Sequence, residues 1–161
     1  MAAQMSITIT GLNELIAKCK APIHAAPVRK AFTESALDLE AKAKSLVNVG
    51  PTGNLRRSIL HKIDGAAIPT FAEVGLLGGG PVSKLGKRYG EYVHEGTPAH
   101  IIRPKSKKAL FWKGAPGPRR KVKHPGYKGN PFLTNAKNAM AGRIQGYFDR
   151  AAREVEAIWG R

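Results

Sequence analysis

At 161 residues and 42% hydrophobic composition, the chain is long enough for one domain (residues 1–161) with its own core. It has no apolar run of the roughly 18 residues that a membrane-spanning helix needs, and no signal-peptide pattern. Its one cysteine, Cys19, excludes an internal disulfide and a cysteine-based zinc site, and we expect a small buried apolar residue there. Twenty-seven Lys and Arg against eleven Asp and Glu give a charge of +16, which favours nucleic acid, acidic proteins or acidic membranes as partners without choosing among them.

The N-terminal part predicts a strand, a short helix and then a long helix. Residues 6–10 alternate polar and β-branched side chains, which is typical of a strand, and a short helix is expected over residues 14–20. The long helix is expected from about Pro27 to Val47, ended by Gly50-Pro51. Its apolar residues recur at steps of three and four: Val28, Phe32, Ala36, Leu39, Ala43 and Leu46. This stripe favours packing on a sheet, with a partner-binding groove as the alternative.

The middle of the chain predicts short elements separated by turns. Residues 52–54 have turn chemistry, and residues 55–65 indicate a short helical turn or a strand. Residues 71–77 alternate and predict a second strand. The glycine run at residues 78–81 lacks the Lys-Ser/Thr ending of a phosphate-binding loop, so it does not indicate nucleotide binding.

A short helix or bent edge is expected over residues 87–95, closed by Gly96. Within it, Tyr89, Tyr92 and Val93 stand at i, i+3 and i+4 and can share one side. We expect these three side chains to pack in the core.

Two apolar runs then flank a polar turn at residues 104–107. Residues 101–102 and 109–112 therefore predict a β-hairpin. Residues 113–129 are rich in Pro, Gly, Lys and Arg, too long for a tight turn and too polar to be buried. They predict an extended basic loop or arm, of the kind that is usually functional or disordered.

The last element is predicted as a helix from about Phe132 to Trp159, preceded by Pro131 and followed by Gly160. Its apolar residues keep helical spacing throughout: Leu133, Ala136, Met140, Ile144, Tyr147, Phe148, Ala151, Val155 and Ile158. Two long amphipathic helices with four or five short strands predict an α+β fold. In it, both helices pack on a small antiparallel sheet and the basic loop extends from them.

Charge is segregated along the chain, because no Asp or Glu occurs between Glu95 and Asp149. We expect a partner or polyanion contact from the cations of this interval, chiefly Arg103, Lys105, Lys107, Lys108, Arg119, Arg120, Lys121 and Lys123. Phe111, Trp112 and Tyr127 are interleaved with them and would suit stacking beside phosphates. The alternative is a solvated loop with these aromatic rings packed beneath it. No known DNA- or RNA-binding motif is present.

A catalytic or metal site would have to use His94, His100 and His124 with Glu91 and Glu95. The first two histidines are six positions apart, which is not the i, i+4 spacing of a helical zinc site. The two glutamates stand four apart, as surface pairs often do, and no nucleophile accompanies them. We therefore expect no catalytic site, no metal and no cofactor.

Four phrases in fixed order carry a resemblance to a known family. They are Thr52-Gly53-Asn54-Leu55-Arg56-Arg57-Ser58-Ile59, Tyr89-x-x-Tyr92-Val93-x-x-Gly96-Thr97, Ile102-x-Pro104-Lys105-x-x-Lys108-Ala109-Leu110 and Pro131-Phe132-Leu133. Over about residues 25–158 the chain resembles the tail-completion (head–tail joining, neck) proteins of long-tailed bacteriophages. The family-motif positions are Thr52, Gly53, Leu55, Arg56, Ser58, Tyr92, Gly96, Thr97, Pro131 and Phe132.

The resemblance implies a non-enzymatic virion component, assembled in the host cytoplasm. Such proteins form rings, commonly hexamers, that complete the tail and join it to the head connector. The partners implied are copies of the chain itself and the neighbouring neck, connector and tail-tube proteins, with non-specific DNA contact as a further expectation and no membrane. The family fold is α+β, a small antiparallel sheet packed by a long helix. The competing class is a basic nucleic-acid-binding accessory protein.

Overall fold

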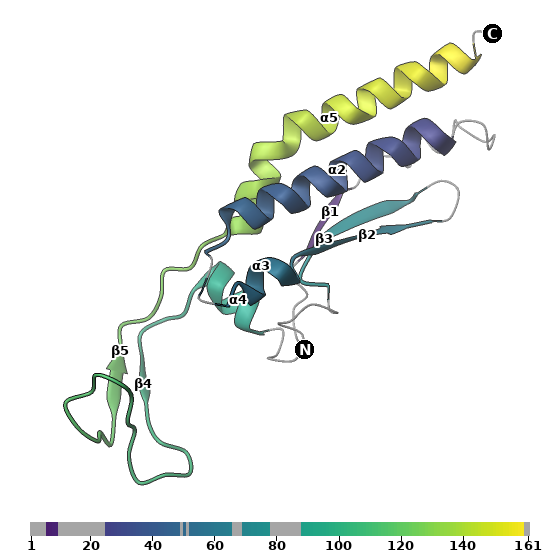
Figure 1. Ribbon diagram of the computed structural model, residues 1–161. Helices are drawn as coiled ribbons and strands as arrows, with labels where there is room; N and C mark the ends of the chain where they lie inside the picture. Colours follow the sequence, from purple (N-terminus) through teal and green to yellow (C-terminus); the bar gives the residue numbers. More distant parts are fainter. Residues whose placement is uncertain are drawn as a thin grey trace.

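The computed structural model describes residues 6–9, 25–48, 50, 52–65, 69–77 and 88–159. In chain order the elements are β1 (Ser6–Ile9), α2 (Ala25–Leu46), α3 (Asn54–Ser58), β2 (Leu60–Asp64), β3 (Phe71–Gly75), α4 (Arg88–Glu95), β4 (His100–Ile102), β5 (Val122–His124) and α5 (Phe132–Trp159). The expected α+β fold is confirmed. A body holds the long helices and a sheet, and a narrow arm projects from one end of it (Figure 1). The helix expected over residues 14–20, the glycine run at residues 78–81 and Cys19 lie outside the described residues.

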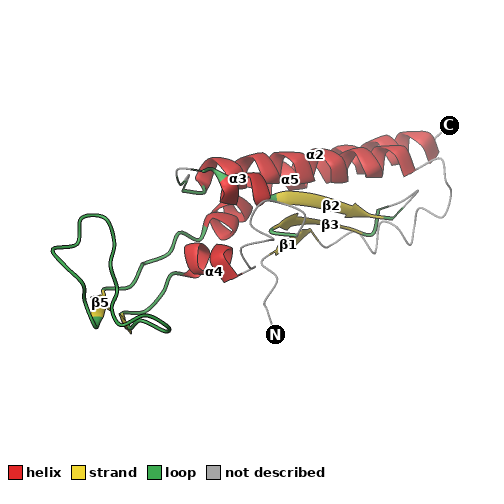
Figure 2. Cartoon of the chain, turned by 60° about the horizontal axis from the view of Figure 1, so that its bottom comes forward, coloured by secondary structure: helices red, strands yellow, loops and turns green. Residues whose placement is uncertain are grey.

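The body is built in two layers (Figure 2). One layer is an antiparallel sheet of order β1-β3-β2, in which Val74 of the central strand lies opposite Ile7 on one side and His61 on the other. The other layer is α2 and α5, which lie side by side and run in opposite directions. Helix α2 packs on β2 and β3, while α5 also reaches β1. Ala72 and Val74 are fully buried while Phe71 and Glu73, which alternate with them on β3, are only partly buried, so one face of the sheet meets the helices.

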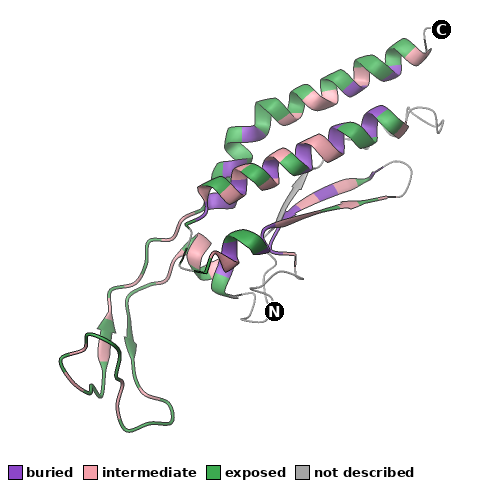
Figure 3. Cartoon of the chain, viewed as in Figure 1, coloured by how far each residue is buried: buried purple, intermediate pink, exposed green. Residues whose placement is uncertain are grey.

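The core lies where the two helices and the sheet meet (Figure 3). The predicted stripe of α2 is buried there, except that Leu46 is partly buried, and Phe132, Leu133 and Ala136 at the start of α5 are buried too. The rings of Phe32 and Phe148 meet edge to face at a centroid distance of 5.2 Å and join the helices. The apolar spacing of both helices therefore has the packing role that it predicts.

Residues 55–65, which indicated either a helical turn or a strand, form both in succession, α3 and then β2. The prediction for the tyrosines of α4 is wrong, because Tyr89 and Tyr92 remain 47% and 49% exposed. The inward side of α4 is instead made by Gly90, which is buried, and by Val93, which packs against the core. A Cβ on Gly90 would lie 1.9 Å from Cδ1 of Leu76, so a side chain at that position would require the Leu76 side chain to move.

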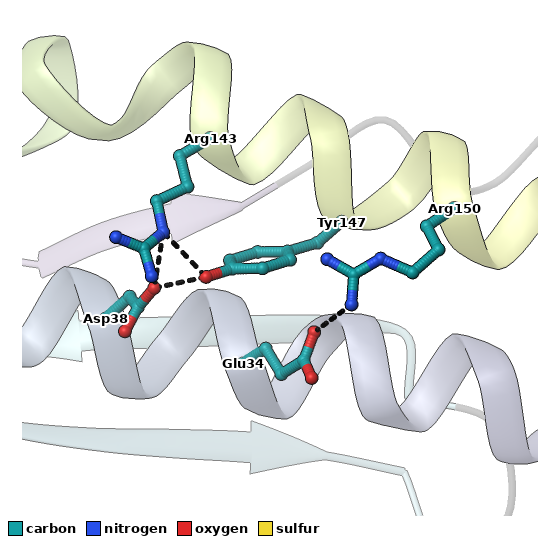
Figure 4. A network of polar contacts seen from close by, with 5 residues as sticks. All are labelled: Glu34, Asp38, Arg143, Tyr147 and Arg150. Carbon is teal, nitrogen blue, oxygen red and sulfur yellow. Dashed lines mark hydrogen bonds and ion pairs between the residues drawn. The ribbon is translucent and has the colours of Figure 1, made fainter.

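A polar clamp fastens α5 to α2 above this core (Figure 4). Nε of Arg143 lies 2.9 Å from Oδ2 of Asp38 and donates to the Tyr147 hydroxyl at 2.8 Å, and that hydroxyl donates to Asp38. Further along, Nη1 of Arg150 lies 3.5 Å from Oε2 of Glu34. Both guanidinium groups lie over the Tyr147 ring, 5.8 Å and 5.3 Å from its centroid. The tyrosine is the centre of the clamp.

Replacing Tyr147 with phenylalanine should therefore lower the free energy of unfolding by about 1 kcal/mol. This is the net value of the lost hydrogen bond to Asp38, whose carboxylate keeps its ion pair with Arg143. The ring and its cation contacts remain in this variant. Urea unfolding followed by circular dichroism measures the change. Asn138→Ala, at an exposed position of the same helix, is the control and should leave stability within about 0.5 kcal/mol of the parent. An unchanged midpoint in Tyr147→Phe would show that the hydroxyl's hydrogen bonds in the clamp contribute no stability.

Glu40 makes a second polar link, from α2 to the sheet. Its carboxylate accepts from Lys44 one turn on and from His61 of β2. Burial raises the pKa of Glu40, but the hydrogen bonds from Lys44 and His61 and their charges lower it further, so the net pKa lies below the ordinary 4.5. The stability that this carboxylate contributes is present above about pH 4.5 and is lost only as the pH falls below that value.

Candidate functional site

The feature with the clearest functional signature is the projecting segment of residues 97–130, here called the basic arm. The polypeptide leaves the body after α4, runs out along the arm and returns to the body before α5 (Figure 1). At the base, Thr97 and Tyr127 exchange two backbone hydrogen bonds, with N···O distances of 2.8 Å and 2.9 Å. Strands β4 and β5 pair further out, and Leu110 and Arg119 exchange another two bonds at 2.8 Å and 2.9 Å. The basic arm is thus an irregular two-stranded ribbon.

This pairing corrects the predicted hairpin. Residues 101–102 do not pair with residues 109–112; instead β4 pairs with β5, with His100 opposite His124 and Ile102 opposite Val122. Two loops, over residues 103–109 and 111–118, therefore lie between the paired segments. The loop predicted over residues 113–129 is only the returning half of the arm and contains a strand. Strand pairing depends on contacts distant in sequence, which the local alternation of residues 101–112 does not report.

Glycines allow the outgoing and returning segments of the arm to touch at its base. Gly96 and Gly126 have φ values of +90° and +88°, which glycine adopts without strain. A Cβ on Gly96 would lie 2.2 Å from the Tyr127 carbonyl oxygen, and one on Gly126 would lie 2.5 Å from the Thr97 carbonyl oxygen. Backbone packs directly on backbone here, so a side chain at either position would separate the ribbon.

Two asparagines attach this base to the body. Nδ2 of Asn130 donates to the carbonyl oxygen of Leu46 at 2.9 Å, satisfying one of the free carbonyls at the end of α2. It also lies 3.2 Å from Oδ1 of Asn48, whose own Nδ2 donates to the Tyr127 hydroxyl at 3.1 Å. The backbone N–H of Asn130 donates to Val93 of α4 at 2.7 Å. The arm therefore leaves the body in a fixed direction.

The structure brings all the predicted contact cations together on this arm. They are Arg103, Lys105, Lys107, Lys108, Arg119, Arg120, Lys121 and Lys123, joined by Lys113 and Lys128, and every one is exposed. Among the described residues none of them forms an ion pair with a carboxylate; the ion pairs of Glu34, Asp38 and Glu40 are on the body. The arm is largely exposed (Figure 3), and its sequence contains cations but no Asp or Glu to neutralise them.

Most family-motif positions lie in the body, and none lies on the outer part of the arm. Leu55, Ser58 and Phe132 are buried in the body, and Gly96 and Thr97 lie at the base of the arm. Thr52, Gly53 and Arg56, with Lys44 and Arg57, line a surface hollow of about 390 Å³ beside α3. Tyr92 is exposed on α4, and Pro131 directly precedes α5. Of these residues, Gly96 and Thr97 make backbone contacts at the base of the arm.

The aromatic residues of the arm are exposed and are not packed beneath it. Phe111 is 72% exposed and Trp112 is 46% exposed. With Ile102, Leu110 and Val122 they line a hollow of about 360 Å³. Sequence reasoning missed this hollow, because its residues come from three segments that only the β4–β5 pairing brings together. The one local signal was that apolar residues are interleaved with cations.

The histidines considered as metal ligands fall into two separate contacts. His100 and His124 stack on the arm with ring centroids 5.0 Å apart, whereas His94 packs edge to face on Phe132 at 5.4 Å. Nδ1 of His100 lies 2.9 Å from the Pro98 carbonyl oxygen, and the N–H of Gly126 donates to Nδ1 of His124 at 3.1 Å. In the described part of the chain, no group of three or more His, Cys, Asp or Glu side chains is placed to hold a metal ion.

His94 is unusual because both of its ring nitrogens are buried with no hydrogen-bond partner among the described residues, and Oε1 of Glu91 on the same helix is in the same state. Burial lowers the pKa of His94 below its ordinary 6.5, and the charge of Glu95 opposes this only in part. At neutral pH the folded protein therefore favours a neutral imidazole at the contact between α4 and α5.

The expected consequence is a loss of stability in mild acid. The unfolded chain takes up the proton first, so the contribution of His94 is complete above about pH 6.5 and is lost as the pH falls from there through the lower folded-state pKa. Thermal melts from about pH 8 to about pH 5 should show this decline, at pH values above those at which Glu40 titrates. In His94→Gln, which cannot take up the proton, the decline should be smaller; an unchanged decline would assign it to other groups.

Among the described residues, no helix combines the length and apolar character needed to cross a membrane. Comparisons with known protein families, with curated proteins and with solved structures find no match to this chain.

Proposed function

We propose that this chain is a structural protein of the neck or tail terminus of a long-tailed bacteriophage. In the proposed assembly, subunits form a ring, commonly of six, that completes the tail and meets the head connector. The basic arm docks on an acidic surface of a neighbouring neck, connector or tail-tube protein. The role is one of assembly and not of catalysis. The proposal begins from the resemblance carried by the four phrases described above.

The observation that carries the proposal is the combination of a fixed base and an unneutralised arm. Asn130, Asn48 and the glycine contacts hold the arm in one direction away from the body. A projection whose base is held in place loses less conformational entropy on binding than a loose loop does. Its exposed cations have no carboxylate partner among the described residues, so a negatively charged counter-surface would supply the missing charges.

The ring comes from the resemblance. Heterologous contacts between exposed loops of neighbouring subunits close into a ring when the rotation between subunits permits. At the separate contact between the arm and an acidic neighbouring protein, charge complementarity would give orientation and a fast association rate more than raw affinity.

Sedimentation equilibrium of the purified chain, combined with negative-stain images, tests the ring. We expect a closed oligomer of defined mass and annular particles. A chain that remains monomeric at all concentrations and shows no annular particles would contradict the proposal.

The second candidate function is a basic nucleic-acid-binding accessory protein, and one observation favours it. Phe111, Trp112 and Tyr127 are exposed among the cations, as in proteins that stack bases while contacting phosphates. This alternative predicts tight binding to nucleic acid, with an affinity that falls steeply as salt rises. Filter binding with a duplex and a single strand, from low to moderate salt, measures that slope. Weak binding that vanishes at moderate salt is the result expected for the neck protein.

A further inference from the structure

The two faces of the β4–β5 ribbon differ in chemistry. Paired residues of antiparallel strands place their side chains on the same face, and successive residues alternate. Ile102 and Val122 therefore share one face with the stacked rings of His100 and His124. Ile101 and Lys123 share the opposite face. Although Ile101 and Ile102 are neighbours in sequence, only Ile102 lines the hollow.

The hollow is a built feature of the arm. Leu110, fixed by its two bonds to Arg119, and the following Phe111 and Trp112 complete the wall that Ile102 and Val122 begin. Its volume of about 360 Å³ lies at the low end of the range of roughly 300–1,000 Å³ typical of ligand pockets. All five lining residues are apolar, so the hollow offers little to a phosphate or a carboxylate. It suits a bulky apolar group.

Cations adjoin this apolar site. Arg119 is paired with Leu110 and shares its side of the ribbon, while Arg103 and Lys121, respectively, directly follow Ile102 and precede Val122 beyond the ends of the two strands; all three are exposed, and Lys123 lies on the opposite face. A second arm is a poor occupant, because its like charges would repel these cations. The occupant that matches both chemistries has negative charges around one bulky apolar side chain.

We propose that the hollow receives an apolar anchor residue carried by an acidic segment of a partner protein. The inference rests on the proposed docking of the arm on an acidic protein and adds the site and the residue type that give this contact its specificity. Carboxylates of the segment meet the adjoining cations and speed the encounter, while burial of the anchor between Ile102, Val122 and Trp112 slows dissociation. Apolar anchors in pockets with a polar rim commonly dominate the binding energy of an interface.

The test uses the full chain and labelled synthetic peptides of equal length, each rich in glutamate, with Gly, Ala, Leu or Phe as the only different residue at the centre. Fluorescence anisotropy measures the Kd of each. We expect the affinity to rise with the apolar size of the central residue, by about tenfold or more from Gly to the best anchor. Ile102→Ser should abolish this rise and leave the weak, salt-sensitive binding of the Gly peptide.

Ile101→Ser is the matched control, because it makes the same change at the adjacent position, which is 51% exposed on the opposite face. It should retain the full dependence on the central residue. Phe111→Ser changes the most exposed residue of the hollow and serves as a second test variant in case Ile102→Ser disturbs the ribbon. It should also reduce the dependence of affinity on the central residue of the peptide.

Equal affinity for all four peptides, or equal effects of Ile101→Ser and Ile102→Ser, would overturn the anchor site while leaving electrostatic docking intact. Failure of every acidic peptide to bind, with a DNA oligonucleotide bound instead, would overturn the acidic partner itself and with it the docking part of the proposed function.

Discussion

Replacing Gly96 with alanine is expected to detach the basic arm from the body while the core between α2, α5 and the sheet stays folded. The added Cβ would lie 2.2 Å from the Tyr127 carbonyl oxygen and 2.8 Å from the Gly129 nitrogen, both backbone atoms that cannot turn aside. The residue would also have to keep a φ of +90°. Strain of about 1–3 kcal/mol and the loss of two backbone hydrogen bonds of about 1 kcal/mol each give a local cost of roughly 3–5 kcal/mol.

Amide hydrogen exchange measures this cost at the residues concerned. The amides of Thr97, Tyr127 and Asn130 should exchange far faster in Gly96→Ala, whereas those of α2 and the second half of α5 should stay protected.

Two other glycines separate the causes. Gly114→Ala meets the same positive φ, +88°, but open space, so it should show the backbone strain without the collision. Gly142→Ala lies in α5 with nothing within 4 Å and should stabilise the helix by about 0.5–1 kcal/mol. If Gly96→Ala were no more damaging than Gly114→Ala, the contact between the two backbones would not be what holds the arm.

Neutralising Arg119, Arg120, Lys121 and Lys123 with glutamine is expected to leave the fold intact and impair docking. All four side chains are exposed and have no carboxylate partner among the described residues, so the folded state loses no ion pair. Mutual repulsion within the arm falls, and the thermal midpoint should be unchanged or slightly higher. Association with an acidic partner should slow by about 10–10³-fold at low salt, the range attributed to electrostatic steering.

The yield of joined particles in a phage head–tail joining assay, together with stopped-flow association kinetics, measures the effect. The matched control removes the same number of charges from exposed positions of the body, by Lys30→Gln, Lys62→Gln, Lys137→Gln and Arg153→Gln. This control should join heads and tails almost normally. Normal joining by the arm variant would refute the docking role of these cations.

The two long helices could be predicted almost to the residue. Their apolar spacing persists over many turns, and Pro131 and Gly50 mark ends that helices favour. Strand β3 could also be predicted, because one buried face makes its side chains alternate. The cations of the arm could be placed together as well, since an interval without carboxylates is visible in the sequence alone.

The pairing inside the arm could not be predicted in this way. Strand β4 is three residues long and exposed throughout, so no alternation of buried and exposed side chains identifies its partner. The register depends instead on backbone contacts at Gly96 and Gly126, which lie together at the base of the arm but are thirty residues apart in sequence. The apolar hollow follows from that pairing and was therefore hidden too.

The orientation of α4 was hidden for a related reason. Helical spacing showed that Tyr89, Tyr92 and Val93 could share a side, but it does not decide which side meets the body. The side of α4 that faces the body is the one with Gly90, where Leu76 occupies the space next to the glycine. A glycine carries no hydrophobic signal, so this contact is absent from any apolar pattern.

Zero-length carbodiimide cross-linking of assembled particles, followed by mass spectrometry, tests the central claim most directly, because it joins an amine to a carboxylate only where the two are in contact. The arm lysines, Lys105, Lys107, Lys121 and Lys123, should be linked to Asp or Glu residues of a different virion protein. Particles in which these lysines are linked to no other protein, and are protected by DNA instead, would contradict the account.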